Sequence, residues 1–206
     1  MSGETQVRLI AAAQHDDQAH QAADEPAGDV PGSAMNIEYY VQRSNAGLII
    51  SEGTQVSPVG KGYMATPGIY SEAQVAGWKK ITDAVHEAGS KIIAQIWHVG
   101  RITHPDLTGG ATPIAPSAIK PNVVAYSAKG KLEVPTPHAL TVSEIKDVVG
   151  QFRKAAANAI KAVEKKGFAD ERFFIMRDAS GRYFPVFVGR DRLMQRGVHW
   201  HFNCVG

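Results

Sequence analysis

Two short apolar runs, separated by one amphipathic pattern, most strongly constrain the fold of this chain. Residues 47–51 and 91–97 are mostly apolar, which is typical of strands buried on both faces of a parallel sheet. Between them, residues 71–88 repeat apolar side chains every three or four positions, and Ser71 and Gln74 have capping-box spacing. Strand, helix and strand in this order predict a βαβ unit with a right-handed crossover.

A second helix pattern follows a long, proline-rich connection. Residues 98–140 contain six prolines, and within them residues 123–134 predict a hairpin around a Ser-Ala-Lys-Gly turn. Thr141 and Glu144 then form another capping box, and the helix predicted after it ends at Gly167. Its buried face is expected to consist of Ile145, Val148, Val149, Phe152, Ala155, Ala156, Ala159 and Val163. The fold class is therefore α/β.

Length and composition exclude several classes of protein. The chain has 206 residues, short of the roughly 250 that a closed (β/α)₈ barrel requires. A single cysteine, Cys204, excludes a disulfide scaffold or a cysteine-built zinc site and favours a cytoplasmic location. No apolar run is long enough to span a membrane, and a net charge of +2 does not indicate nucleic-acid binding by the whole chain.

The two ends of the chain differ in composition from its middle. Residues 1–33 carry six acidic residues, one basic residue and no aromatic residue, which predicts a flexible acidic leader. Residues 169–206 hold six of the ten arginines and none of the lysines, and they predict a β-rich tail of unrecognised origin. Its hairpin is expected over 172–188, with a third strand over 198–203. The α/β region is expected to span 34–168.

Residues suited to bind a flat ligand follow the two apolar strands. In parallel α/β proteins, chemistry takes place beyond the carboxyl ends of the strands. Gln95 offers a donor and an acceptor there, Gly53 lets a ring approach the backbone, and Trp97 offers a wall. These residues favour a pocket for a planar conjugated cofactor. Simple core packing is the alternative interpretation of Gln95 and Trp97.

Other reactive side chains do not form a recognisable site. Neither the pair His98 and His104 nor the pair His199 and His201 has a third ligand at a suitable spacing, so no metal site is expected. Cys204 has no evident base beyond nearby histidines, so no nucleophile is assigned. Arginines interleaved with aromatic residues in the tail can bind phosphate or nucleic acid, but a solvated sheet face is the expected explanation.

Residues 38–57, 94–101 and 113–118 contain the longest of a series of ordered motifs. By these motifs, the middle of the chain resembles the old yellow enzyme family of FMN-dependent ene-reductases. The resemblance extends over roughly residues 23–168 and is greatest to the branch of N-ethylmaleimide reductases and alkene reductases. Its motifs run in order and at matching spacing through residues 38–57, 62–63, 66–70, 77–79, 94–101, 113–118 and 136–140.

This resemblance implies a fold, a reaction and a set of site residues. The fold would be a partial (β/α)₈ TIM barrel with about three of its eight units. In the family, NAD(P)H reduces FMN, which passes hydride to the β-carbon of an activated alkene such as an enone. By position, Gln95 matches the residue that binds the flavin pyrimidine edge and Gly53 matches a backbone contact to the ring. Tyr63 and Trp97 match residues on the substrate side, and the hairpin over 120–135 matches an element that caps the barrel mouth.

The chain also departs from the family pattern. Residues 15–20 stand where the family has a first strand with a flavin-contacting Thr or Ser, and no proton-donating Tyr or phosphate-binding strand follows Phe168. No catalytic residue is therefore assigned. One hypothesis is an FMN-dependent enzyme acting on small-molecule alkenes. The other is a non-catalytic, truncated or recombined remnant with a binding or structural β tail, whose exposed barrel edges could promote oligomerisation.

Overall fold

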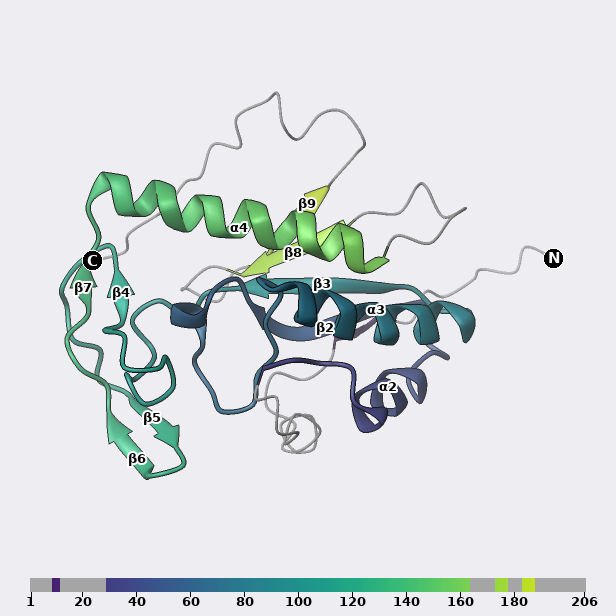
Figure 1. Ribbon diagram of the computed structural model, residues 1–206, viewed down its shortest axis with the longest axis horizontal. Helices are drawn as coiled ribbons and strands as arrows, with labels where there is room; N and C mark the ends of the chain where they lie inside the picture. Colours follow the sequence, from purple (N-terminus) through teal and green to yellow (C-terminus); the bar gives the residue numbers. More distant parts are fainter. Residues whose placement is uncertain (1–8, 12–28, 164–172, 178–182, 188–206) are drawn as a thin grey trace.

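A computed structural model of the chain describes residues 9–11, 29–163, 173–177 and 183–187 (Figure 1). Its main element is a five-stranded sheet with the strand order β1-β2-β3-β8-β9. The first four strands are parallel and the last is antiparallel to its neighbour. The strands are β1 (Leu9–Ala11), β2 (Leu48–Gln55), β3 (Ile92–Trp97), β8 (Phe173–Arg177) and β9 (Tyr183–Phe187).

In the part of the chain that the structure describes, three α-helices accompany this sheet, and two of them pack side by side on one of its faces (Figure 1). The helices are α2 (Ala34–Val41), α3 (Glu72–Glu87) and α4 (Val142–Val163), and a short 3₁₀ helix, η1, spans Pro58–Gly60. The order β2-α3-β3 confirms the predicted βαβ unit, and β3-α4-β8 repeats it with a longer connection. Consecutive units of this kind, joined by parallel pairing, are how a (β/α)₈ barrel is built.

Local sequence signals explain where the helices begin. The Ser71 hydroxyl accepts from the Gln74 backbone N–H at 3.2 Å, and the Gln74 side chain accepts from the Ser71 N–H at 3.0 Å, which confirms the predicted capping box of α3. Ser33 and Asn36 form the same reciprocal arrangement at the start of α2, a helix that the sequence analysis did not identify. Asparagine at the third position replaces the usual Glu or Gln, so the pattern is easily missed.

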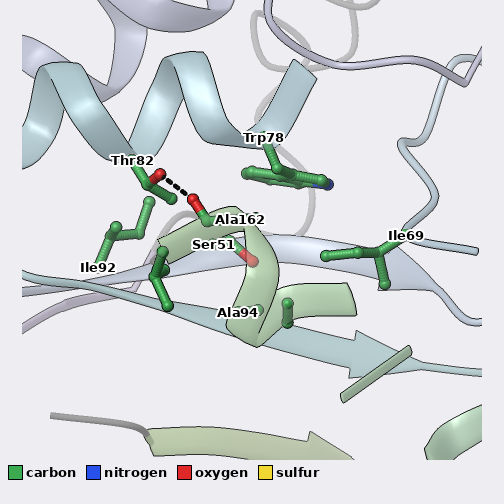
Figure 2. A pocket seen from close by; sticks show the side chains of 9 residues that line it. Ser51, Ile69, Trp78, Thr82, Ile92, Ala94 and Ala162 are labelled. Carbon is green, nitrogen blue, oxygen red and sulfur yellow. Dashed lines mark hydrogen bonds between the residues drawn. The ribbon is translucent and has the colours of Figure 1, made fainter. Parts of the chain in front are cut away.

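The core lies between the helices and the sheet. It centres on fully buried aliphatic side chains from β2, α3 and β3, together with Trp78 and the small residues Ala155, Ala159 and Ala162 of α4. Two buried hydrogen bonds tie α4 to its surroundings: Thr82 Oγ1 donates to the Ala162 carbonyl at 2.6 Å, and Asn158 Nδ2 donates to the Ile69 carbonyl at 2.8 Å. A small cavity of about 20 Å³ remains between α3, α4 and the strands (Figure 2).

The predicted buried face of the second helix is only partly correct. Ala155 and Ala159 are buried, but the apolar residues in the first half of α4 are only half-buried, and Val142 is 71% exposed. The reason is geometric: α4 is longer than α3 and its first half extends beyond it (Figure 1). Periodicity shows which side of a helix is apolar, but neighbouring elements decide how much of that side is covered. The half-buried positions are Ile145, Val148, Val149 and Phe152.

The connection between β3 and α4 contains two small sheets at one end of the main sheet (Figure 1). Strands β4 (Ile114–Ala115) and β7 (His138–Ala139) pair in parallel. The predicted hairpin is confirmed: β5 (Val124–Ser127) and β6 (Gly130–Glu133) pair in antiparallel orientation. Gly130 has a φ of +93°, which glycine adopts without steric cost and which closes the turn.

Both ends of the chain contribute strands to the main sheet. Within the predicted leader, Leu9–Ala11 pairs with β2. The first strand therefore lies before residues 15–20, the stretch that the family resemblance had aligned with it. At the other end, β8 and β9 confirm the predicted hairpin, and β8 pairs in parallel with β3. The tail therefore occupies the next strand position of the sheet. The turn over 178–182, the third strand over 198–203 and Cys204 lie outside the described residues, and the domain boundaries at 33 and 168 stay predictions.

Candidate functional site

A β-bulge in β2 sets the geometry at the carboxyl ends of the central strands. Ile50 pairs with Ile93, but the next pair joins Gly53 to Gln95, so β2 contains one extra residue. The register then continues, and Gln55 pairs with Trp97. The bulge therefore places Gly53 directly beside Gln95, its partner on the neighbouring strand.

Gly53, Gln55, Gln95 and Trp97 lie on the same face of the two strands. Partners in a parallel ladder share a face, and residues two apart on one strand return to it. Ala94 belongs to the opposite face, since it lines the cavity under α3 and α4. We call the face with Gly53, Gln55, Gln95 and Trp97 the inner face. It brings together three of the four residues predicted to form the site, namely Gly53, Gln95 and Trp97.

Aromatic rings cover the glycine on the inner face. A Cβ atom added at Gly53 would lie 2.5 Å from Cε2 of Trp97, so the indole rests directly against the glycine backbone. The Tyr63 ring stacks on the indole, with centroids 6.0 Å apart and planes inclined by 15°. Tyr63, the fourth predicted residue, thus joins the other three. Only glycine at position 53 permits this arrangement.

The two glutamines of the inner face are fully buried. Gln95 is 2% exposed, and its backbone N–H donates to Ser51 Oγ at 2.9 Å. Gln55 is 0% exposed; its Nε2 donates to the Thr66 carbonyl at 2.7 Å, while its Oε1 has no partner among the described residues. A buried carbonyl oxygen without a partner costs about 1–3 kcal/mol, so it marks a place where a ligand or water is expected.

Further buried polar atoms without partners lie close by in the sequence. Among the described residues, Trp97 Nε1, Ser57 Oγ and His98 Nε2 also have none. Burial lowers the pKa of His98 to about 4, so its ring is neutral near pH 7. Because the Gly100 N–H donates to Nδ1 at 2.9 Å, the proton is assigned to Nε2, which is then a free donor. Gln55 and Ser57 were not among the site residues predicted from the sequence, and His98 was weighed there only as a metal ligand.

Glu52, the residue before Gly53, is a buried acid. The Tyr40 hydroxyl donates to Glu52 Oε1 at 3.3 Å and accepts from the Glu52 backbone N–H at 3.2 Å. Burial raises the pKa of Glu52 to about 7, although the bond from Tyr40 opposes this shift. Burial, reinforced by the Glu52 charge, also raises the pKa of Tyr40 well above its ordinary value. The bulge thus carries a carboxyl group that titrates near neutral pH.

The described residues fit one part of FMN, the cofactor that the resemblance implies. The inner face has a buried glutamine beside a glycine, buried polar atoms without partners among the described residues, and aromatic rings to cover a flat group. These residues fit the phosphate of FMN less well. Arg101, a cation on the loop after β3, donates to the Ile119 carbonyl at 2.8 Å and to Ser117 Oγ at 3.1 Å. The fit therefore extends to the edge of the ring system.

Two absences apply to the part of the chain that the structure describes. Within residues 9–11, 29–163, 173–177 and 183–187, no group of three or more His, Cys, Asp or Glu side chains could hold a metal ion. His199 and His201 lie outside these ranges. In the same ranges, no helix combines the length and the apolar character needed to cross a membrane.

Comparisons with known proteins agree with the geometry. The model of the NADH:flavin oxidoreductase / NADH oxidase family matches residues 15–164. Flavin oxidoreductase hxnT of Emericella nidulans is 45% identical over 129 residues, covering 62% of this chain and 33% of that protein. 12-Oxophytodienoate reductase 7 of Oryza sativa subsp. japonica is 46% identical over 145 residues, covering 66% and 35%. The chain thus spans about a third of the length of these curated relatives.

Solved structures give the same result. An old yellow enzyme homologue from Zymomonas mobilis superposes with a TM-score of 0.65 and 38% identity, over 76% of this chain and 42% of that one. Morphinone reductase in complex with tetrahydroNAD superposes with a TM-score of 0.64 and 41% identity, over 73% and 42%. Both similarities indicate that the described sheet and helices are a partial TIM barrel of the old yellow enzyme type. The chain therefore belongs to the NADH:flavin oxidoreductase / NADH oxidase family.

Proposed function

We propose that this chain supplies the flavin-edge portion of an FMN-dependent oxidoreductase. The proposed reaction passes hydride from NAD(P)H, through the flavin, to an activated alkene of the enone type. One observation carries the proposal: the bulge pairs Gly53 with Gln95 on a buried face where Gln55 Oε1 and Trp97 Nε1 have no partner among the described residues. Family membership supports the general reaction, and the name of the relative in rice indicates a reductase.

Gln95 would bind the cofactor through its side-chain amide. The pyrimidine edge of a flavin alternates carbonyl oxygens with an N–H group, and an amide offers both an acceptor and a donor to such an edge. The amide is held on a buried strand, and at 2% exposure water competes poorly for it. The Trp97 indole occupies the place where a side chain at position 53 would lie, so the ring would contact the Gly53 backbone beside the indole. When bound, FMN would supply the hydride chemistry, which no side chain provides.

Tyr63 and Trp97 would shape the substrate side of this pocket. Their rings stack with centroids 6.0 Å apart, which makes a continuous flat wall next to Gly53. Planar conjugated alkenes pack well against such surfaces because both partners are flat and polarisable. The wall would therefore orient the alkene by contact and keep water away from it. No proton donor is assigned among the described residues.

A titration with FMN tests the proposal. The purified chain is mixed with increasing FMN, and flavin fluorescence and the visible spectrum are recorded, with FMN in buffer as the control. We expect saturable quenching and a protein-bound flavin spectrum. Anaerobic NADH or NADPH should then bleach the bound flavin faster than free flavin, and an added enone should restore its colour. A chain that stays colourless after removal of free FMN contradicts the proposal.

A further inference from the structure

We propose that Ser51 is a positioning residue, which fixes Gln95 so that its amide can meet the flavin edge. The inference rests on the proposed function and deepens it. Ser51 is not on the inner face: its side chain lines the small cavity beneath α3 and α4, together with Thr82 and Ala162 (Figure 2). The residue would thus act on the site through the backbone, from the opposite side of the sheet.

The Ser51 hydroxyl makes two hydrogen bonds at the bulge. Its Oγ accepts from the Gln95 backbone N–H at 2.9 Å and donates to the Glu52 carbonyl at 2.8 Å. Ser51 is 1% exposed, so water cannot replace either bond without a structural change. A bulge interrupts the ladder of backbone hydrogen bonds between neighbouring strands. Here a side chain fills the gap and gives the Gln95 N–H the acceptor that the ladder lacks.

Other contacts hold the bulge itself but do not reach β3. Thr54 Oγ1 donates to the same Glu52 carbonyl at 3.0 Å, and the Glu52 N–H donates to the Tyr40 hydroxyl at 3.2 Å. Among these side-chain contacts of the bulge, the bond from Gln95 to Ser51 is the one that crosses between the strands. The hydroxyl of Ser51 therefore sets the distance and tilt of Gln95 relative to Gly53. Hydrogen bonds weaken steeply when their angles are distorted, so this tilt should affect ligand binding.

Three substitutions separate this role from general stability. Ser51→Ala and Thr54→Val each remove one buried hydroxyl that donates to the Glu52 carbonyl, but only Ser51→Ala also removes the acceptor of Gln95. Thr54→Val is therefore the matched control. Ser51→Thr keeps the hydroxyl, and the cavity of about 20 Å³ that Ser51 lines offers space next to its extra methyl group. It is the conservative variant expected to rescue binding.

The experiment measures three quantities for each variant: the FMN dissociation constant, the melting temperature and the hydrogen-exchange rate of the Gln95 amide without FMN. We expect Ser51→Ala to weaken FMN binding by about tenfold and to speed exchange at Gln95, as the loss of one buried hydrogen bond predicts. Thr54→Val should lower the melting temperature similarly but leave the dissociation constant within about twofold. Ser51→Thr should behave like the wild type in both binding and exchange.

Each other outcome contradicts a specific claim. Equal FMN affinity in Ser51→Ala and wild type overturns the inference and leaves the proposed function standing. An equal loss in Thr54→Val also overturns it, because the effect then belongs to the bulge as a whole. Absence of FMN binding by the wild type overturns the proposed function and the inference with it. If Ser51→Ala does not fold, Ser51→Cys replaces it, since a thiol is a weak acceptor and the same loss of affinity is expected.

Discussion

Strands β2 and β3 present two faces that differ in how their polar atoms are satisfied. Toward the helices, two buried polar side chains are paired, in the bonds from Thr82 to Ala162 and from Asn158 to Ile69. On the inner face, Gln55 Oε1 and Trp97 Nε1 are buried and have no partner among the described residues. The same two strands thus lie between an apolar core on one side and, on the other, a face with buried polar atoms that have no partner among the described residues.

Under the proposed function, this difference separates a face that stabilises the fold from a face that binds the cofactor. An unpaired buried polar atom costs about 1–3 kcal/mol, so a face with several of them is less stable than its packing would allow. A ligand with matching polar atoms removes that cost, and the free energy recovered in this way adds to the binding free energy. Substitutions on the two faces should therefore separate: helix-side changes should alter unfolding, and inner-face changes should alter FMN binding.

The largest effect is expected at Ile81, on the helix side. Ile81 is 0% exposed in the main core, and Ile81→Ala removes its side chain and leaves a cavity. We expect a loss of about 3 kcal/mol in the free energy of unfolding, measured by urea denaturation. The folded variant should bind FMN with unchanged affinity. A drop in affinity that accompanies the stability loss would show that the two faces are coupled.

The next effect concerns Glu52, at the bulge between the two faces. Its pKa rises from an unfolded value of 4.5 to about 7 on folding. An acid of this kind favours the folded state fully below pH 4.5, and this contribution is lost as the pH rises toward 7. Glu52→Gln should abolish this loss. From pH 4 to pH 8, the free energy of unfolding of the variant should therefore rise by about 3 kcal/mol relative to that of the wild type.

Denaturation curves of both proteins across this pH range test the prediction. The difference between the two free energies isolates Glu52, because the other titrating groups are common to both proteins. Glutamine is the suitable replacement since its Oε1 can still accept from the Tyr40 hydroxyl, which contacts Glu52 at 3.3 Å. A difference that does not vary with pH would mean that folding leaves the pKa of Glu52 at its unfolded value, which contradicts the prediction.

A smaller effect is expected at Gln95, on the inner face. Gln95→Leu keeps most of the volume but removes both polar atoms of the amide. We expect FMN binding to weaken about tenfold, or about 1.4 kcal/mol, while the free energy of unfolding changes by less than about 1 kcal/mol. Fluorescence titration and urea denaturation provide the two values. A variant that binds FMN as tightly as the wild type would exclude Gln95 as a ligand of the flavin edge.

The smallest effect is expected at Thr82, which returns to the helix side. Thr82→Val is nearly isosteric and removes the bond to the Ala162 carbonyl, which measures 2.6 Å in the structure. The expected loss is about 1 kcal/mol, seen as a modest fall in the urea midpoint, with no change in FMN affinity. This variant is also the helix-side counterpart of Thr54→Val, since each removes one buried threonine hydroxyl that donates to a carbonyl.

Signals within short segments were enough to predict much of the fold. The strand-helix-strand unit, the capping box at Ser71 and the β5–β6 hairpin all follow from spacings of a few residues, and the structure confirms them. Helix α2 was missed because Asn36 replaces the usual capping partner, and β1 was missed because three residues give no periodicity. Gly53, Gln95 and Trp97 were predicted from their positions after the two strands and from the family resemblance, and Tyr63 was predicted from the resemblance alone. Gln55 was not predicted because it differs in no local way from a core glutamine.

The sequence by itself determined the α/β class, the positions of the main helices and the family to which the chain belongs, because helix caps, apolar periods and motifs are local properties. Only the tertiary structure decided that β8 joins the sheet beside β3 and that a bulge pairs Gly53 with Gln95. These pairings depend on hydrogen bonds between distant segments, such as that between Ser51 and Gln95, which lie 44 positions apart. No local pattern specifies such a register, because it is fixed by the packing of both strands at once.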